Sequence, residues 1–316
     1  MRKPGGYLSP AGGIGGLALL ATAYVVGTVA AGGITTSTAL PVSEDQVIIR
    51  GQMKHLRSTV DPSPMDRELT VWAFPTVAVY GATEKLAIFG IFPYLDKRLR
   101  VTTPMGRRTR GDAGVGDFTL LGRYTVGQWD YQGETLRLAP FAGIEIPTGE
   151  DDEGDALGGL PQTLQLGSGS WDPIAGGVFT WQTLDWEFDV STSYKFNTQE
   201  NHFEFGDVAR LDLSFQYRVW PWKFDEDASD EDDSDGVPGF LYGVIESNLI
   251  WQDRNEVSGS RDSDSGGTTW YLAPGIQFVT RRFVLEAVVQ LPVVQELNGD
   301  ALENDFIVTA GFRVNF

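Results

Sequence analysis

An alternation with a period of two residues runs through most of the chain, and it limits the fold more than any other feature. The stretch 306–316 places three Phe, two Val and an Ala on one face and Ile, Thr, Gly, Arg and Asn on the other. The stretches 186–197 and 207–219 repeat this division into an apolar, aromatic face and a polar face. Because successive side chains of a β-strand point to opposite sides, the pattern predicts strands that separate two environments.

Twelve such stretches follow one another, separated alternately by short turns and longer loops. Connections that are alternately short and long are typical of transmembrane barrels. A soluble secreted β-sandwich, the alternative fold, gives no reason for this order of connections. The sequence therefore predicts an all-β fold, a transmembrane antiparallel up-and-down β-barrel of about 12 strands. We expect the strands near 46–56, 68–80, 85–95, 116–128, 135–147, 171–182, 185–197, 207–219, 239–252, 268–280, 283–294 and 305–316, with long loops at 57–67, 96–115, 148–170, 198–206, 253–267 and 295–304.

The first residues have the build of a secretory signal peptide. Two basic residues precede an apolar stretch from Leu17 to Ala31 that ends in small residues. This stretch is shorter than the roughly 20 apolar residues of a membrane-spanning helix, so we expect cleavage near Ala30 or Ala31. The predicted organisation is a signal peptide at 1–31 and a barrel at 32–316, in the outer membrane of a Gram-negative-type cell.

Composition excludes two classes of function. The chain contains no cysteine, which fits an exported protein that folds without disulfides and rules out thiolate chemistry. Its formal net charge of −19 makes nucleic acid an unfavourable partner, since phosphate binding requires basic surfaces.

Projecting the alternation onto every predicted strand assigns fifteen charged residues to the barrel interior. Eight are basic and seven are acidic, and this near balance favours a network of ion pairs across a narrow lumen over a selectivity ring of one sign. These lumen-lining candidates are Arg50, Lys54, Arg123, Arg137, Lys195, Arg210, Arg218 and Arg313, together with Asp117, Glu145, Glu187, Asp189, Asp212, Glu246 and Glu286.

Six aromatic residues are also expected on the inner wall. They could contact a hydrophobic or aromatic solute, or they could simply pack inside a small barrel, which requires less assumption. They are Trp72, Phe74, Tyr80, Phe141, Tyr242 and Tyr271.

One connection breaks the rule of short turns on its side of the barrel. Residues 224–236 read FDEDASDEDDSDG, with eight acidic residues, which predicts a disordered, solvated insertion. Glu231, Asp233, Asp235 and Gly236 also imitate the start of a calcium-binding EF-hand loop, but Tyr242 stands at its twelfth position, where the bidentate Glu is needed. The acidic runs 150–153 and 262–264 could likewise be solvated or bind divalent ions at a lipopolysaccharide surface.

The sequence nominates no catalytic, cofactor or metal site. His55 projects to the lipid-facing side and His202 lies in a predicted loop, and no serine has a spacing that would complete a hydrolase triad with either of them. The passage 167–171 is not a nucleophile elbow, and 111–116 has the glycine spacing of neither a dinucleotide nor a phosphate loop. No cluster of His or Cys offers a transition-metal site.

Two resemblances add to this reading. The terminal Phe316 resembles the C-terminal signature that the barrel-insertion machinery reads in outer-membrane proteins. The passages 114–124, 146–149, 166–172 and 311–316 resemble the family of outer-membrane proteins named for the MetA pathway of phenol degradation, whose members are often labelled transporters. That resemblance implies passage of small, in part aromatic, molecules, but it assigns no binding residues, and the insertion 224–236 departs from it.

Three functions stay open at this point. The leading hypothesis is a passive outer-membrane channel or facilitator for a small aromatic or hydrophobic solute. The second is a closed structural or partner-binding barrel, which a fully paired interior would favour. The third is an outer-membrane lipid hydrolase, for which His55 is the one candidate base. Expected partners are outer-membrane lipid, lipopolysaccharide and the insertion machinery.

Overall fold

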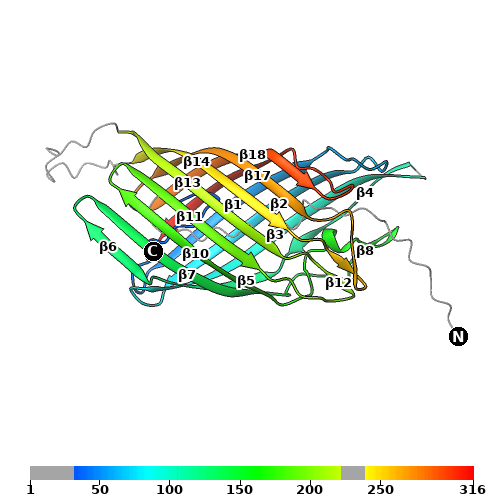
Figure 1. The fold of residues 1–316 in the computed structure, drawn as a ribbon, viewed down its shortest axis with the longest axis horizontal. Helices are drawn as coiled ribbons and strands as arrows, with labels where there is room; N and C mark the ends of the chain where they lie inside the picture. The colour runs from blue at the N-terminus through cyan, green and yellow to red at the C-terminus, as the bar shows by residue number, and fades with distance from the viewer. Residues whose placement is uncertain (1–31, 105, 222–238) are drawn as a thin grey trace.

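The computed structural model describes residues 32–104, 106–221 and 239–316 (Figure 1). The predicted signal peptide at 1–31 and nearly all of the connection that carries the acidic insertion at 224–236 therefore lie outside the described residues. In the described part of the chain, no helix is both long enough and apolar enough to span a bilayer.

The described strands close into one antiparallel barrel with twelve strands in its wall, which confirms the predicted fold class. The last strand pairs with the first, from Arg57 opposite Phe306 to Ile48 opposite Asn315, and so completes the ring. Eleven of the twelve are β1 (Val47–Ser58), β2 (Glu68–Gly81), β3 (Leu86–Thr103), β7 (Glu134–Ile146), β10 (Asp172–Thr183), β11 (Trp186–Lys195), β13 (Val208–Trp220), β14 (Phe240–Gln252), β17 (Gly267–Val279), β18 (Phe283–Leu297) and β19 (Phe306–Asn315).

The remaining strand consists of three pieces. β4 (Gly106–Val115) pairs with β3, β5 (Phe118–Tyr124) pairs with both β3 and β7, and β6 (Gly127–Tyr131) pairs with β7 alone. The sequence predicts a loop at 96–115, and that prediction is wrong, because β3 and β4 continue as a hairpin beyond the other strands (Figure 1). The alternation does continue there, with Leu99 and Val101 buried between exposed arginines, but its charges resemble those of a loop.

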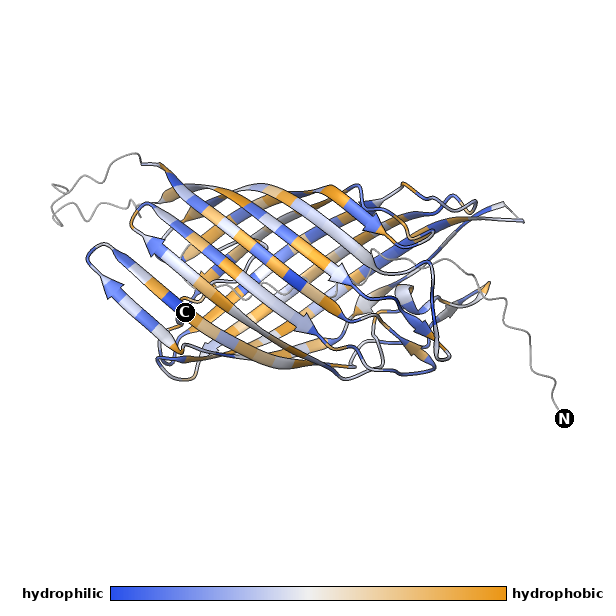
Figure 2. Cartoon of the chain, viewed as in Figure 1, coloured by the Kyte–Doolittle hydropathy of each residue, from blue (hydrophilic) through white to orange (hydrophobic). Residues whose placement is uncertain are grey.

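The wall separates an apolar exterior from the interior, and hydrophobic and hydrophilic residues alternate along several of its strands, as orange and blue in Figure 2. Large apolar side chains such as Ile245, Ile276 and Leu285 are exposed on the outside. Trp181 and Trp186 make an edge contact with ring centroids 4.8 Å apart, beside the short turn between β10 and β11. A closed barrel with an apolar belt and aromatic residues near its rim is built to span the outer membrane.

Three of the six aromatic residues predicted on the inner wall face outward instead. Trp72 stacks on the lipid-facing His55 at 4.2 Å, and Phe74 and Tyr80 are about two-fifths exposed. The projection fails on β2 because this strand is apolar on both faces. Its inward residues are Leu69, Val71, Ala73, Val77 and Val79, all buried. Phe141 and Tyr271 are buried, and Tyr242 shares the inner face with Arg218, which lies opposite it.

Candidate functional site

The barrel interior contains a segment of chain that precedes the first strand. Residues 32–42, here called the internal segment, form no strand or helix, and all of them except Pro41 are buried. They lie in the half of the lumen near the short turns, because the next residues meet the turn after β2, where Asp45 N donates to Gly81 O at 2.9 Å. We call this the short-turn end and the opposite end the long-loop end. The position of this segment inside the barrel was not predicted, because residues 32–46 precede the first predicted strand and show no alternation.

Glu246 holds the first part of the internal segment. Its carboxylate accepts hydrogen bonds from the backbone N–H of Thr35 at 2.9 and 3.1 Å, from the Thr35 hydroxyl at 2.7 Å and from the N–H of Thr36 at 3.1 Å. A Cβ at Gly33 would lie 2.5 Å from Glu246 Oε1 and 2.9 Å from the backbone oxygen of Thr36, so a larger residue there would displace the Glu246 carboxylate or the backbone. A carboxylate that accepts several N–H and O–H donors is well solvated by the protein itself.

Wall residues also donate to carbonyl groups of the internal segment. Arg50 Nη2 and Gln52 Nε2 donate to Ile34 O at 2.9 and 3.2 Å, and Gln277 Nε2 donates to Gly32 O at 2.8 Å. The wall therefore binds the backbone of the internal segment rather than long side chains. Most residues of the internal segment are small, which suits the narrow lumen.

Arg123 and Thr180 hold the second part. The Thr38 and Thr180 hydroxyl oxygens lie 3.0 Å apart, and the N–H of Ala39 donates to Thr180 Oγ1 at 2.7 Å. The Arg123 guanidinium donates through Nη1 to Thr38 O and through Nη2 to Leu40 O, the latter at 2.7 Å. The same guanidinium lies over the Phe89 ring, 5.0 Å from its centroid.

The structure buries all fifteen predicted lumen residues and brings several of them together. Glu286 lies 2.5 Å from Arg50 and 3.7 Å from Arg313, Lys195 lies 2.5 Å from Glu145, and Arg210 lies 3.0 Å from Asp212. Arg137 and Arg218 pair instead with carboxylates at the short-turn end, Asp130 and Asp185. Asp189 accepts from Thr180 and Glu187 from Gln182, while Lys54 lies buried on β1. That these residues meet a passing solute stays a prediction.

The interior is not uniformly polar, which the alternation alone did not predict. Ion pairs join β1 and β19 to β18 and join β7 to β11, whereas one cluster of inward side chains from β1, β2, β3, β5, β7 and β10 is apolar and surrounds the second half of the internal segment. The apolar sector, as we call it, comprises Ile48, Val77, Val79, Ala87, Phe89, Ile91, Leu121, Ala139, Phe141, Ile174 and Val178, and Ala39 and Val42 of the internal segment pack against it.

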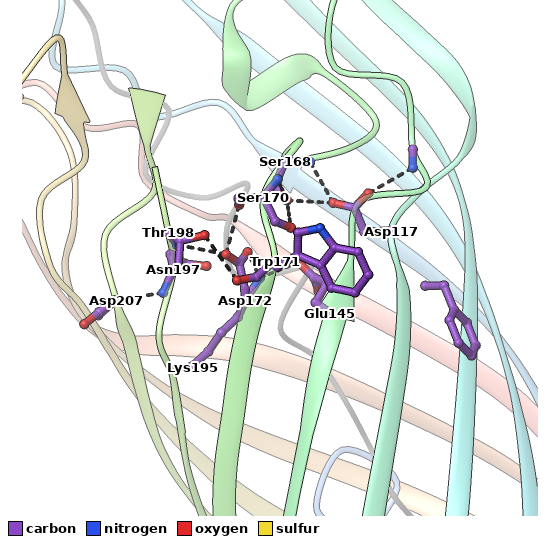
Figure 3. A network of polar contacts seen from close by, with 12 residues as sticks. Asp117, Glu145, Ser168, Ser170, Trp171, Asp172, Lys195, Asn197, Thr198 and Asp207 are labelled. Carbon is purple, nitrogen blue, oxygen red and sulfur yellow. Dashed lines mark hydrogen bonds and ion pairs between the residues drawn. The ribbon is translucent and has the colours of Figure 1, made fainter. Parts of the chain in front are cut away.

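A second polar network fixes the loop between β7 and β10 to the long-loop end of the wall (Figure 3). Asp117, at the break between β4 and β5, accepts from the backbone N–H groups of Thr148, Gly149 and Ser168 at 3.0, 2.9 and 2.6 Å and from the Ser168 hydroxyl at 2.8 Å. Asp117 is one of the predicted lumen residues, but the structure gives it this anchoring role because it lies where the strand is interrupted.

Lys195 links the same loop to the neighbouring strands. It lies 2.5 Å from Glu145 and 3.3 Å from Asp172, whose carboxylate also accepts from Ser170 Oγ at 2.9 Å and from the N–H of Thr198 at 2.9 Å (Figure 3). Asp172 lies within the predicted strand 171–182 but is not among the predicted lumen residues.

Apolar loop residues fill the long-loop half of the lumen. Leu160 and Leu164, the latter in the 3₁₀ turn η1 (Gln162–Leu164), pack with Leu302 against apolar wall residues. Lys97 Nζ donates to the carbonyl of Gln165 at 2.5 Å and so ties the loop to β3. The apolar wall residues that contact Leu160, Leu164 and Leu302 are Leu56, Leu69, Val71, Leu99, Val208, Ile250, Tyr271 and Ile307.

The hairpin of β3 and β4 contributes one more tie to this loop. Arg110 on β4 donates to Asp155 in β8 (Gly154–Asp155) at 2.9 and 3.1 Å. These hydrogen bonds hold the pKa of the Asp155 carboxyl below its ordinary value. The remaining short strands, β9 (Gly158–Gly159), β12 (Phe203–Glu204), β15 (Glu256–Val257) and β16 (Ser260–Arg261), lie in the long loops.

Two candidate features, a metal-binding cluster and His55, can be compared with the geometry of the described residues. No three His, Asp or Glu side chains of this part of the chain lie close enough to hold a metal ion. His55 Nδ1 makes no hydrogen bond, and the ring is stacked on Trp72 with Phe306 at 6.0 Å. A general base needs a nucleophile and an orienting group within reach, and this position provides neither.

Comparison with known proteins gives a family match and several solved structures with similar folds. A family model described as "Putative MetA-pathway of phenol degradation" matches residues 65–280. An outer membrane channel from Pseudomonas putida F1 has 16% sequence identity, with a TM-score of 0.65 over 88% of this chain and 98% of that chain. At this identity the likeness shows a shared barrel fold.

Two further solved barrels match with lower TM-scores, and no curated protein matches the chain. The β-domain of the Bordetella autotransporter BrkA has 12% identity and a TM-score of 0.43, over 87% of this chain and 100% of that chain. The NanC porin has 11% identity and a TM-score of 0.40, over 85% and 98%.

Proposed function

The chain belongs to the family described as "Putative MetA-pathway of phenol degradation", and we propose that it is an outer-membrane channel for passive passage of small aromatic or hydrophobic solutes. One observation carries the proposal. The internal segment lies in the short-turn half of the lumen, is not part of the wall, and is held by hydrogen bonds to Glu246, Arg50 and Arg123 and by packing of Ala39 and Val42. Water can replace such bonds, so the segment can leave without opening the barrel.

A solute in the vacated lumen would meet two different walls. Buried charged side chains such as Arg313 and Glu286 would line one part of the lumen, and the apolar sector would line another. A small molecule with an apolar body and one polar group suits this division, because each part finds a matching surface. No sequence motif for nucleotide binding is present, so a concentration gradient would supply the driving force.

The alternative is a closed structural or partner-binding barrel. A specific observation favours it, since Leu160, Leu164 and Leu302 fill the long-loop half while the internal segment fills the other. The channel hypothesis therefore requires two movements, one of the internal segment and one of the loop anchored by Asp117 and Lys195.

Single-channel recording in planar bilayers distinguishes the two functions. Protein purified from outer membranes should give discrete conductance steps, and an aromatic solute such as phenol or benzoate should reduce them. The folded state of the same sample would be checked by the β-sheet signal in circular dichroism. A folded barrel that never conducts under any applied voltage would refute the channel and leave the closed barrel.

We also propose how the chain reaches the membrane. Residues 1–31 would direct export and be removed, lipid and lipopolysaccharide would surround the barrel, and the insertion machinery would read Phe316, whose side chain is exposed beside the first residues of β1. Mass spectrometry of the outer-membrane protein should show a chain that begins near Ala31 or Gly32. Removal of Phe316 should lower the amount of assembled barrel, and an unchanged amount would contradict this role.

A further inference from the structure

Arg123 and the apolar sector around it combine features that suit one class of ligand. We propose that they form a binding site for small aromatic carboxylates, which residues 38–42 of the internal segment occupy in this structure. The inference rests on the proposed channel function and adds the chemical class of its solute.

The two carbonyl groups bound to Arg123 stand in for the oxygens of a carboxylate. Nη1 and Nη2 of the guanidinium donate to two separate oxygens, Thr38 O and Leu40 O. A planar guanidinium with two adjacent donors fits the two oxygens of a carboxylate, and a charged acceptor makes stronger hydrogen bonds than a carbonyl does. An arriving carboxylate therefore gains an advantage over the segment that it replaces.

The surroundings of Arg123 fit an aromatic ring. Phe141 lies directly opposite Arg123 in the pairing of β5 with β7, and the Phe89 ring lies beneath the guanidinium. Ala39 and Val42 are the parts of the internal segment that pack into this sector. When they leave, the rings and the aliphatic side chains nearby would be exposed to water, and a flat apolar body would cover them again.

The surroundings of Arg123 differ from those of Arg210, another buried arginine of the interior. Arg123 is 1% exposed and projects from β5 among residues of the apolar sector, whereas Arg210 projects from β13 and lies 3.0 Å from Asp212. Arg210 thus provides a matched control position.

Equilibrium dialysis of benzoate against the full-length, detergent-solubilised barrel tests the inference directly. Benzyl alcohol, which has the same ring and no charge, should bind at least about tenfold more weakly, as expected for loss of a charge-assisted bidentate contact. Arg123→Met should weaken benzoate binding by a similar factor, while Arg210→Met should leave it unchanged. Equal binding of the two compounds, or an Arg123→Met variant that binds benzoate normally, would overturn the inference.

A second variant leaves Arg123 in place and covers the case in which Arg123→Met does not fold. The T38C/T180C protein should form a disulfide, because the two hydroxyl oxygens lie 3.0 Å apart and the chain has no other cysteine. Oxidation should lock the internal segment over Arg123 and abolish benzoate binding, and reduction should restore it. Binding that is the same in both states would contradict the inference.

Failure of this inference and failure of the channel function give different results. Dialysis does not require permeation, so a barrel that binds benzoate but never conducts contradicts only the channel. A barrel that conducts but binds benzoate no better than benzyl alcohol contradicts only the aromatic carboxylate site.

Discussion

Glu246→Gln should loosen the internal segment without opening the barrel wall. The wild-type carboxylate accepts from the N–H and the hydroxyl of Thr35 and from the N–H of Thr36, at 2.7 to 3.1 Å. Glutamine keeps one oxygen but presents an NH₂ group to donors that need an acceptor. With hydrogen bonds to a charged group contributing about 1.5–3 kcal/mol each, we expect docking of the segment to weaken by roughly 2–4 kcal/mol.

Hydrogen exchange measured by mass spectrometry would report this change. Since about 1.4 kcal/mol corresponds to a tenfold change in an equilibrium constant, the Thr35 and Thr36 amides should exchange roughly 30- to 900-fold faster. Glu145→Gln is the matched control, because Glu145 pairs with Lys195 and no hydrogen bond or ion pair joins it to the internal segment in the described structure. If the amides of 32–42 exchange at the wild-type rate in a folded Glu246→Gln barrel, Glu246 does not hold the segment and the reasoning is wrong.

Three further predictions concern the loops and the outer wall. Burial alone would raise the pKa of Asp61, but hydrogen bonds from Arg67 and Ser63 outweigh it and hold this pKa below its ordinary value. The stability that these hydrogen bonds contribute is present above the ordinary pKa of Asp and is lost as pH falls through the folded-state pKa of Asp61. Limited proteolysis of 59–67 should therefore increase only below about pH 4, and the same cleavage rate at low pH and at pH 7 would contradict this. Leu164→Ala should cost about 2–5 kcal/mol of packing and raise protease cleavage within 148–170 on intact cells, whereas unchanged cleavage would show that Leu164 does not hold the loop. The purified wild-type protein and its His55→Ala variant should both show only background phospholipase activity. Wild-type activity that the variant loses would support the hydrolase hypothesis.

The wall could be predicted from the sequence because each of its residues meets one of two environments. A strand such as β11 alternates between lipid and a polar interior, so its faces differ in composition, and its predicted limits differ from the observed ones by at most two residues. β2 shows where the rule ends. Both of its environments are apolar, so Trp72 and Val71 cannot be assigned to a side by hydropathy.

The contents of the lumen could not be predicted in the same way. The internal segment has no periodicity, because its conformation follows from wall side chains that are distant in sequence, as Thr35 with Glu246 shows. Its one sequence signal is the run of small, uncharged residues from Gly32 to Ala39, which suits a narrow space. The role of Asp117 likewise depends on a break between β4 and β5 that its local sequence does not reveal.

Single-channel recording of the T38C/T180C variant tests the central claim most directly, namely that the internal segment closes a channel. The Thr38 and Thr180 hydroxyl oxygens are in hydrogen-bond contact, so oxidation fixes the segment in its observed position. The account predicts no conductance steps in the oxidised protein, with wild-type steps appearing in the same bilayer after a reductant is added, while the single T38C variant conducts throughout. Equal conductance before and after reduction would show that the segment does not control the lumen.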